Sequence, residues 1–172
     1  NVAAHATDLQ PSRHRLHHGE ASVAQLLQHF GWALDLREMA YFAHWLTPVT
    51  RPKRFDTRFF VRLAPPQQQA VPDLNEALEL MWLTPDEALD TQRGLKLLNV
   101  TQQVLRSLRG FADARSVFDH ALVYRGVKRI LPRPAVGRDG PRFITDDDPA
   151  YEEVARLDPD SRGEARCELA PG

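Results

Sequence analysis

The sequence lacks the patterns of several large protein classes. It has a single cysteine, Cys167, so no internal disulfide can form, which excludes a disulfide-stapled domain and fits a reducing, cytoplasmic setting. No apolar run approaches the roughly 20 residues that a membrane-spanning helix needs. The formal net charge is −1, without the basic excess of a protein that binds nucleic acid through phosphate contacts. We therefore expect neither nucleic acid nor a membrane as a partner.

Common catalytic and cofactor-binding motifs are missing as well. The chain contains no G-x-S-x-G nucleophile turn, no P-loop and no G-x-G-x-x-G fingerprint. Three histidines, His14, His17 and His18, have a spacing that suits two metal ligands on one helix face. Because no second pair completes the set, we interpret them as part of a flexible, solvated polar segment at residues 1–19.

Charge is unevenly distributed along the chain. From Arg138 to Gly172 there are 5 basic and 10 acidic residues, so the preceding part is net basic, which suits an anionic small substrate. Large apolar side chains are also sparse near the end. Residues 146–172 are therefore predicted to be an acidic and largely disordered tail.

The first half of the chain shows one helical and two strand-like patterns. Apolar residues at helical spacing predict a helix over residues 20–30 that ends at Gly31, a typical C-cap glycine. Residues 41–46 are rich in aromatics and stop at a Thr-Pro pair, and apolar and charged residues alternate over 55–63. Both segments are predicted strands.

The second half adds one predicted strand and then mainly helices. A third strand is predicted over residues 77–83, and Thr84, Pro85 and Glu87 have the pattern of a capping box that starts a helix reaching about residue 91. Two further helices are expected over residues 101–108 and 113–124, and a short edge strand is expected over residues 127–131. The order of these elements indicates a mixed α+β fold.

One group of motifs resembles a known family. Residues 54–60 read RFDTRFF, and they follow a Trp-Leu-Thr-Pro run at 45–48. The later part of the pattern consists of Asp73, Glu76, Trp82, Pro85 and Glu87-Ala88-Leu89. In order and spacing this resembles the back half of a Nudix hydrolase domain of the coenzyme A diphosphatase-like type, over about residues 13–131. The resemblance implies a partial Nudix-type mixed sheet with a helical insertion and C-terminal helices, so residues 20–145 are expected to form the C-terminal part of such a domain.

The catalytic motif of that family is absent from this chain. The Nudix box, G-x5-E-x7-R-E-U-x-E-E-x-G-U with U a bulky aliphatic residue, places glutamates on one helix face, where they bind Mg²⁺ or Mn²⁺. Arg37-Glu38-Met39 matches its centre, but Tyr41 and Phe42 stand where the next two glutamates belong. We therefore expect the box to precede this chain in a longer parent protein. The chain would then hold no metal itself and would be inactive alone.

The resemblance implies a parent that splits the diphosphate of a nucleotide-linked small molecule, such as coenzyme A or an acyl derivative. Arg54 and Arg58 are candidates for binding its phosphates, because guanidinium groups make bidentate contacts with them, and Asp56 is a candidate partner for either arginine. The alternative is that these three charges only solvate a strand and a loop. Glu76 and Glu79 are candidates for assisting metal or water, with plain surface carboxylates as the alternative.

Two further alternatives concern the apolar residues and the whole chain. Four aromatic residues are expected in the core rather than as a platform on which a base stacks: Trp45, Phe55, Phe59 and Trp82. The chain as a whole has a second interpretation as a complete, non-catalytic binding or assembly module derived from the fold. A homodimer is compatible with both interpretations.

Overall fold

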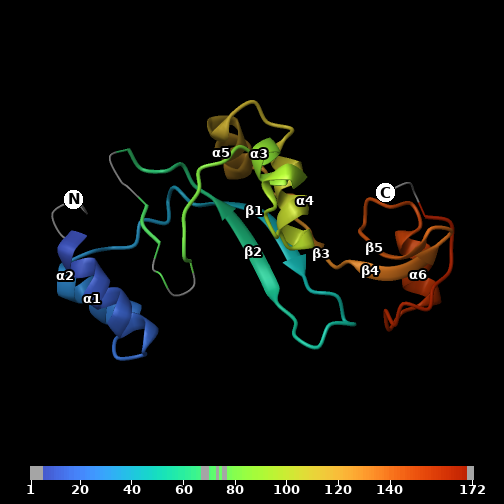
Figure 1. Cartoon of the computed structure of the whole chain (residues 1–172), viewed down its shortest axis with the longest axis horizontal. Helices are drawn as coiled ribbons and strands as arrows, with labels where there is room; N and C mark the ends of the chain where they lie inside the picture. The colour runs from blue at the N-terminus through green and yellow to red at the C-terminus, as the bar shows by residue number, and fades with distance from the viewer. Residues whose placement is uncertain (1–5, 67–69, 73, 75–76, 170–172) are drawn as a thin grey trace.

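The middle of the molecule is a three-stranded mixed sheet. The structure is a computed structural model that describes residues 6–66, 70–72, 74 and 77–169. In the sheet, β1 (Ala40–Leu46) lies between β2 (Asp56–Val61), which is antiparallel to it, and the short β3 (Arg129–Ile130), which is parallel to it. Two helices precede the sheet and a small unit follows it, as Figure 1 shows. This mixed sheet within a helical chain confirms the predicted α+β class.

The two faces of the sheet differ, as the alternation in the sequence predicts. Phe59 and Val61 are half-buried, whereas Arg58 and Phe60 are exposed. A register shift between Tyr41 and Ala43 interrupts the pairing of β1 with β2. Beyond it the pairs are regular, so the side chains of successive residues on β2 point to opposite faces.

One helix, α5 (Ala114–Val123), packs on one face of this sheet. Before it in the chain, α3 (Pro85–Leu89) is followed by a 3-10 turn, η2 (Thr91–Arg93), and packs against α4 (Asn99–Leu108). The predicted capping box is present, because the Glu87 N–H donates to Thr84 Oγ1 over 3.2 Å and the Thr84 N–H donates to the Glu87 carboxylate over 2.8 Å. Both predicted helices at 101–108 and 113–124 are present.

The core between α5 and the sheet is small. Its buried members are Ala40, Phe118 and Ala121, and Phe118 is the one large side chain among them. Half-buried apolar residues surround these three: Phe42, Val61, Leu63 and Leu122. Since Phe55 is 55% exposed and Trp82 is 76% exposed, the expectation that these two aromatics belong to the core is wrong.

The strand predicted over residues 77–83 does not form. This segment joins no strand within the part of the chain that the structure describes, and it exposes Leu78, Leu80 and Trp82. A strand needs a neighbour to take up its backbone hydrogen bonds. The alternating pattern is present, but no described strand pairs with it.

A second structured unit follows the sheet. It consists of β4 (Arg133–Gly137), β5 (Gly140–Ile144) and α6 (Tyr151–Leu157), with β4 and β5 paired as a hairpin. Its core consists of five buried residues, and all of them except the isoleucine are alanine or valine: Ala135, Ile144, Ala150, Val154 and Ala165. Val154 is fully buried.

This unit differs from the disordered acidic tail expected from residue 146. The buried Asp158 stabilises the segment after α6, because its carboxylate accepts the backbone N–H groups of Arg162, Gly163 and Glu164 over 2.6–3.1 Å. Burial tends to raise the pKa of Asp158, but these hydrogen bonds and the nearby Arg133 charge outweigh it, so the pKa is lowered. The expected boundary at residue 145 thus falls inside one packed unit.

Two helices lie ahead of the sheet. The polar segment predicted to be flexible contains α1 (Ala6–His17), which has Pro11 within it. α2 (Val23–Phe30) matches the predicted helix and ends at Gly31, whose φ of 65° is the left-handed conformation that glycine adopts readily. None of the helices in the described residues is long and apolar enough to span a membrane.

Candidate functional site

The candidate substrate-binding residues lie on and beside β2, at the hairpin that joins it to β1. The register pairs His44 with Arg58 and Leu46 with Asp56. His44 and Asp56 are therefore diagonal neighbours on the face opposite α5, which is within reach of their side chains. The His44 Nε2–H donates a hydrogen bond to Asp56 Oδ1, because an ionised carboxylate can only accept.

Arg58 and Arg129 complete this group. Arg58 Nη2 lies 3.7 Å from Asp56 Oδ2, so Asp56 does pair with one of the two arginines proposed for it. Arg129 on β3 is paired with His44 in the sheet. We call these four residues, His44, Asp56, Arg58 and Arg129, the β-face cluster. It brings three basic side chains to one carboxylate.

Electrostatics keep the carboxylate of the β-face cluster ionised. The hydrogen bond from His44 is the main cause that lowers the pKa of Asp56, and the positive charges of Arg58 and Arg129 lower it further. The Asp56 side chain is 41% exposed and that of Arg58 is 55% exposed, whereas that of His44 is only 12% exposed. A solvent-facing anion can therefore reach the arginine, while the histidine stays in place behind it.

The third candidate, Arg54, lies in the hairpin loop rather than in the β-face cluster. Two hydrogen bonds close this loop: the Thr47 N–H donates to the Phe55 carbonyl over 3.0 Å, and the Phe55 N–H donates to Thr47 Oγ1 over 2.9 Å. Arg54 Nε donates to the Thr47 carbonyl over 3.0 Å. That contact uses one of the five guanidinium N–H groups, and among the described residues no hydrogen bond keeps the other four from an anion.

Of the two glutamate candidates, the structure describes only Glu79. Glu76 lies outside the described residues. Glu79 is exposed in the irregular segment before α3, and no described contact connects it to the β-face cluster. The structure therefore supplies no geometry for a glutamate that assists metal or water.

The described residues do not fit the divalent metal that the family resemblance implies. Within residues 6–66, 70–72, 74 and 77–169, no three His, Cys, Asp or Glu side chains lie close enough together to hold a metal ion. At the end of α1 the ring centroids of His14 and His18 lie 4.0 Å apart, and the His18 Nδ1 contacts the carbonyl of His14 instead of converging with other ligands.

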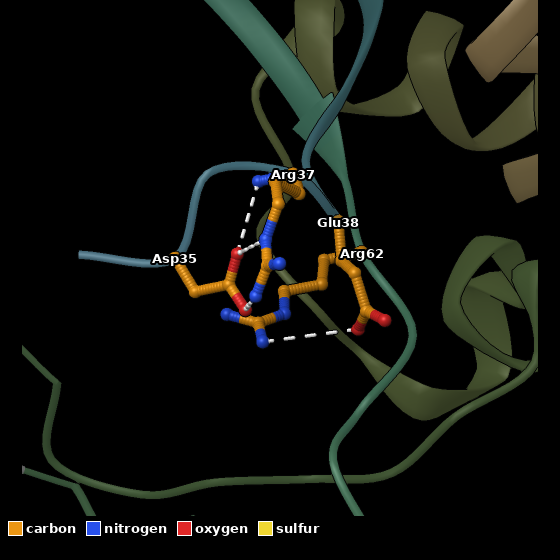
Figure 2. A network of polar contacts seen from close by, with 4 residues as sticks. All are labelled: Asp35, Arg37, Glu38 and Arg62. Carbon is orange, nitrogen blue, oxygen red and sulfur yellow. Dashed lines mark hydrogen bonds and ion pairs between the residues drawn. The ribbon is translucent and has the colours of Figure 1, made fainter. Parts of the chain in front are cut away.

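The partial match to the catalytic motif has a structural role. Residues 37 and 38 lie in a turn before β1 rather than on a helix. Arg37 donates two side-chain hydrogen bonds to Asp35, over 2.9 and 3.0 Å, and Glu38 lies 3.9 Å from Arg62 (Figure 2). Since Glu38 pairs with an arginine and shares no helix face with other glutamates, this segment cannot present a set of metal ligands.

Sequence reasoning missed two members of the β-face cluster, His44 and Arg129. Both are brought in by strand pairing: His44 through its diagonal contact with β2, and Arg129 through the short parallel β3. The signal available in the sequence was the position of His44 in a predicted strand. Its partner became evident only from the register.

Known proteins resemble this chain along most of its length. It is 26% identical to the acyl-coenzyme A diphosphatase NUDT19 of Gallus gallus over 176 residues, which cover 96% of this chain and 45% of that protein. It is also 26% identical to the Homo sapiens protein of the same name over 147 residues, which cover 82% of this chain and 39% of that protein.

The chain spans less than half the length of these curated relatives. No family model and no solved structure matches it. The similarity to the two diphosphatases agrees with the resemblance carried by residues 54–60 and supports membership of the Nudix hydrolase family.

Proposed function

We propose that this chain is the C-terminal part of a Nudix pyrophosphohydrolase. The parent would cleave the diphosphate of a nucleotide-linked small molecule of the coenzyme A or acyl-coenzyme A class, using Mg²⁺ or Mn²⁺ held by glutamates outside this chain. The similarity of nearly the whole chain to acyl-coenzyme A diphosphatases supports the substrate class.

Within that parent, the β-face cluster and Arg54 bind the phosphates of the substrate. The observation that carries this role is the pairing of Asp56 with both His44 and Arg58 on a solvent-facing part of the sheet. Guanidinium groups remain charged at all working pH values and form bidentate contacts with phosphate oxygens. Asp56 holds Arg58 in place and is itself anchored by His44, so the arginine is pre-ordered for an incoming anion.

The division of labour follows from what this chain contains. The glutamate box is missing from its sequence, and the described residues offer no alternative metal ligands. We therefore expect the chain to bind substrate phosphates without hydrolysing them. Exposed apolar side chains such as Trp82 and Leu78 favour this interpretation over a self-contained binding module, because a complete module buries such residues.

Steady-state kinetics on a longer protein that contains this chain and a complete Nudix box would test the binding role. Replacing Arg58 by alanine is expected to raise the KM for acyl-coenzyme A about tenfold, since a charge-assisted hydrogen bond is typically worth about 1.5–3 kcal/mol. Arg115→Ala is the matched control, because Arg115 pairs with Asp119 on the exposed side of α5. An unchanged KM for Arg58→Ala, with both variants folded, would contradict the role given to the β-face cluster.

A further inference from the structure

A pocket lies where the hairpin loop, the start of α4 and the C-terminal unit meet. Its volume is about 410 Å³, within the range of small-molecule sites. Its lining includes Trp45, Arg51, Leu98 and Phe143. Trp45 comes from β1 and Phe143 from β5, so the sheet and the C-terminal unit each contribute one aromatic wall.

These two aromatic rings are not used by either core. Neither Trp45 nor Phe143 belongs to the cluster around Phe118 or to the cluster around Val154. Both are only half-buried. Large aromatic side chains that line a hollow instead of filling a core provide flat apolar surface for a ligand ring.

Arg51 adds a positive charge to the pocket. Its guanidinium lies over the Phe143 ring, with 5.5 Å between Cζ and the ring centroid. Among the described residues no carboxylate pairs with Arg51, whereas the arginines at 37, 58, 62, 93 and 109 each have an acidic partner. A guanidinium held by a ring and left without a carboxylate is suited to a phosphate.

We propose that this pocket binds the base of a nucleotide, with the base against Trp45 and Phe143 and a phosphate on Arg51. The identification of the ligand as a nucleotide rests on the proposed function, but the binding itself requires neither metal nor hydrolysis. Trp45 then serves as a platform on which a base stacks, which was the alternative to its expected position in the core. It also makes the C-terminal unit part of the substrate site.

Isothermal titration of the 172-residue chain with two probes separates the contribution of the aromatic rings to binding from that of the arginine charge. ADP presents both a base and phosphates, and inorganic diphosphate presents the phosphates alone. Phe143→Leu is expected to weaken ADP binding about tenfold and to leave diphosphate binding unchanged, because stacking on one aromatic is typically worth a factor of that size. Arg51→Gln is expected to weaken the binding of both probes.

Two further variants guard against effects on folding. Leu98→Glu changes a side chain that is 74% exposed at the pocket mouth, so the fold should persist while the new carboxylate repels phosphate and weakens ADP binding. Arg138→Gln is the control, since Arg138 is a basic residue at the β4–β5 turn, outside this pocket. It should leave the binding of both probes unchanged.

The outcomes distinguish this proposal from the proposed function. ADP binding that is tighter than diphosphate binding and is weakened in Phe143→Leu and Leu98→Glu supports the pocket, even if no parent protein hydrolyses acyl-coenzyme A. ADP that binds no better than diphosphate, or that binds both variants as tightly as it binds the unchanged chain, overturns the pocket and leaves the role of the β-face cluster untouched.

Discussion

The side chain of Asp56 accepts a hydrogen bond from His44, twelve residues earlier in the chain, across the β1–β2 strand pair. This contact fixes the carboxylate on the same face as Arg58, which lies 3.7 Å away.

Replacing Asp56 by asparagine should weaken the binding of inorganic diphosphate to this chain. The substitution removes the carboxylate that holds Arg58 in place, and an exposed ion pair of this kind is typically worth about a two- to fivefold change in affinity. Isothermal titration at low salt would measure the change. Stronger binding in Asp56→Asn would instead mean that the negative charge of Asp56 opposes the anion more than its contact orients the arginine.

Acid should destabilise the fold in a defined window. The hydrogen bonds from Arg37 lower the pKa of Asp35 to about 2, from an ordinary value of 3.8. Because the pKa of Asp35 is lower in the folded state, its contribution to stability is fully present at pH values above its unfolded-state pKa. That contribution is lost as the pH falls through its folded-state pKa. The melting temperature should therefore be insensitive to Asp35 above about pH 5.

The fall in melting temperature from pH 4 to pH 2 should be smaller in Asp35→Asn than in the unchanged chain, because asparagine does not titrate. Melting curves followed by circular dichroism across this range would measure the difference. Asp119→Asn, which alters a surface carboxylate that pairs with Arg115, serves as the comparison. An identical slope for Asp35→Asn and the unchanged chain would show that the Arg37 contact has no effect on stability.

The loop after α6 should depend on one buried carboxylate. Asp158→Ala leaves three backbone N–H groups without their acceptor, which is expected to cost about 2–3 kcal/mol of unfolding free energy for the C-terminal unit. Asp160→Ala, two residues away and paired with Arg162 on the surface, should change it by less than about 0.5 kcal/mol. Urea titration would measure both, and equal effects would refute the role of Asp158.

The exposed apolar segment before α3 should make the isolated chain prone to association. Trp82→Lys is expected to lower the binding of the dye ANS and to leave the melting temperature unchanged, because Trp82 is 76% exposed and packs in neither core. Trp45→Lys is the contrasting variant, since Trp45 lies half-buried in the central strand. A large fall in melting temperature for Trp82→Lys would show that this residue is packed after all.

Local patterns in the sequence predicted the elements whose determinants are adjacent residues. The capping box at Thr84 and Glu87, the glycine that ends α2 and the alternation along β2 all formed as expected. Each depends on residues within about one turn of a helix or a few positions of a strand.

Features that depend on distant residues were not predicted. The C-terminal unit has a core rich in alanine, and Asp158, an acidic residue, stabilises it from within, so its composition has the appearance of a disordered tail. The segment at 77–83 has the pattern of a strand but lacks a described partner. His44 and Arg129 joined the candidate site through register, which the order of residues in one strand does not determine.

We propose that this chain binds a diphosphate substrate but does not cleave it. The most direct measurement is the hydrolysis of acyl-coenzyme A in the presence of Mn²⁺, followed by chromatography of the nucleotide products. It would be carried out on the 172-residue chain and on a longer protein that adds a complete Nudix box. Products are expected from the longer protein only. Hydrolysis by the 172-residue chain that EDTA abolishes would contradict this division of labour.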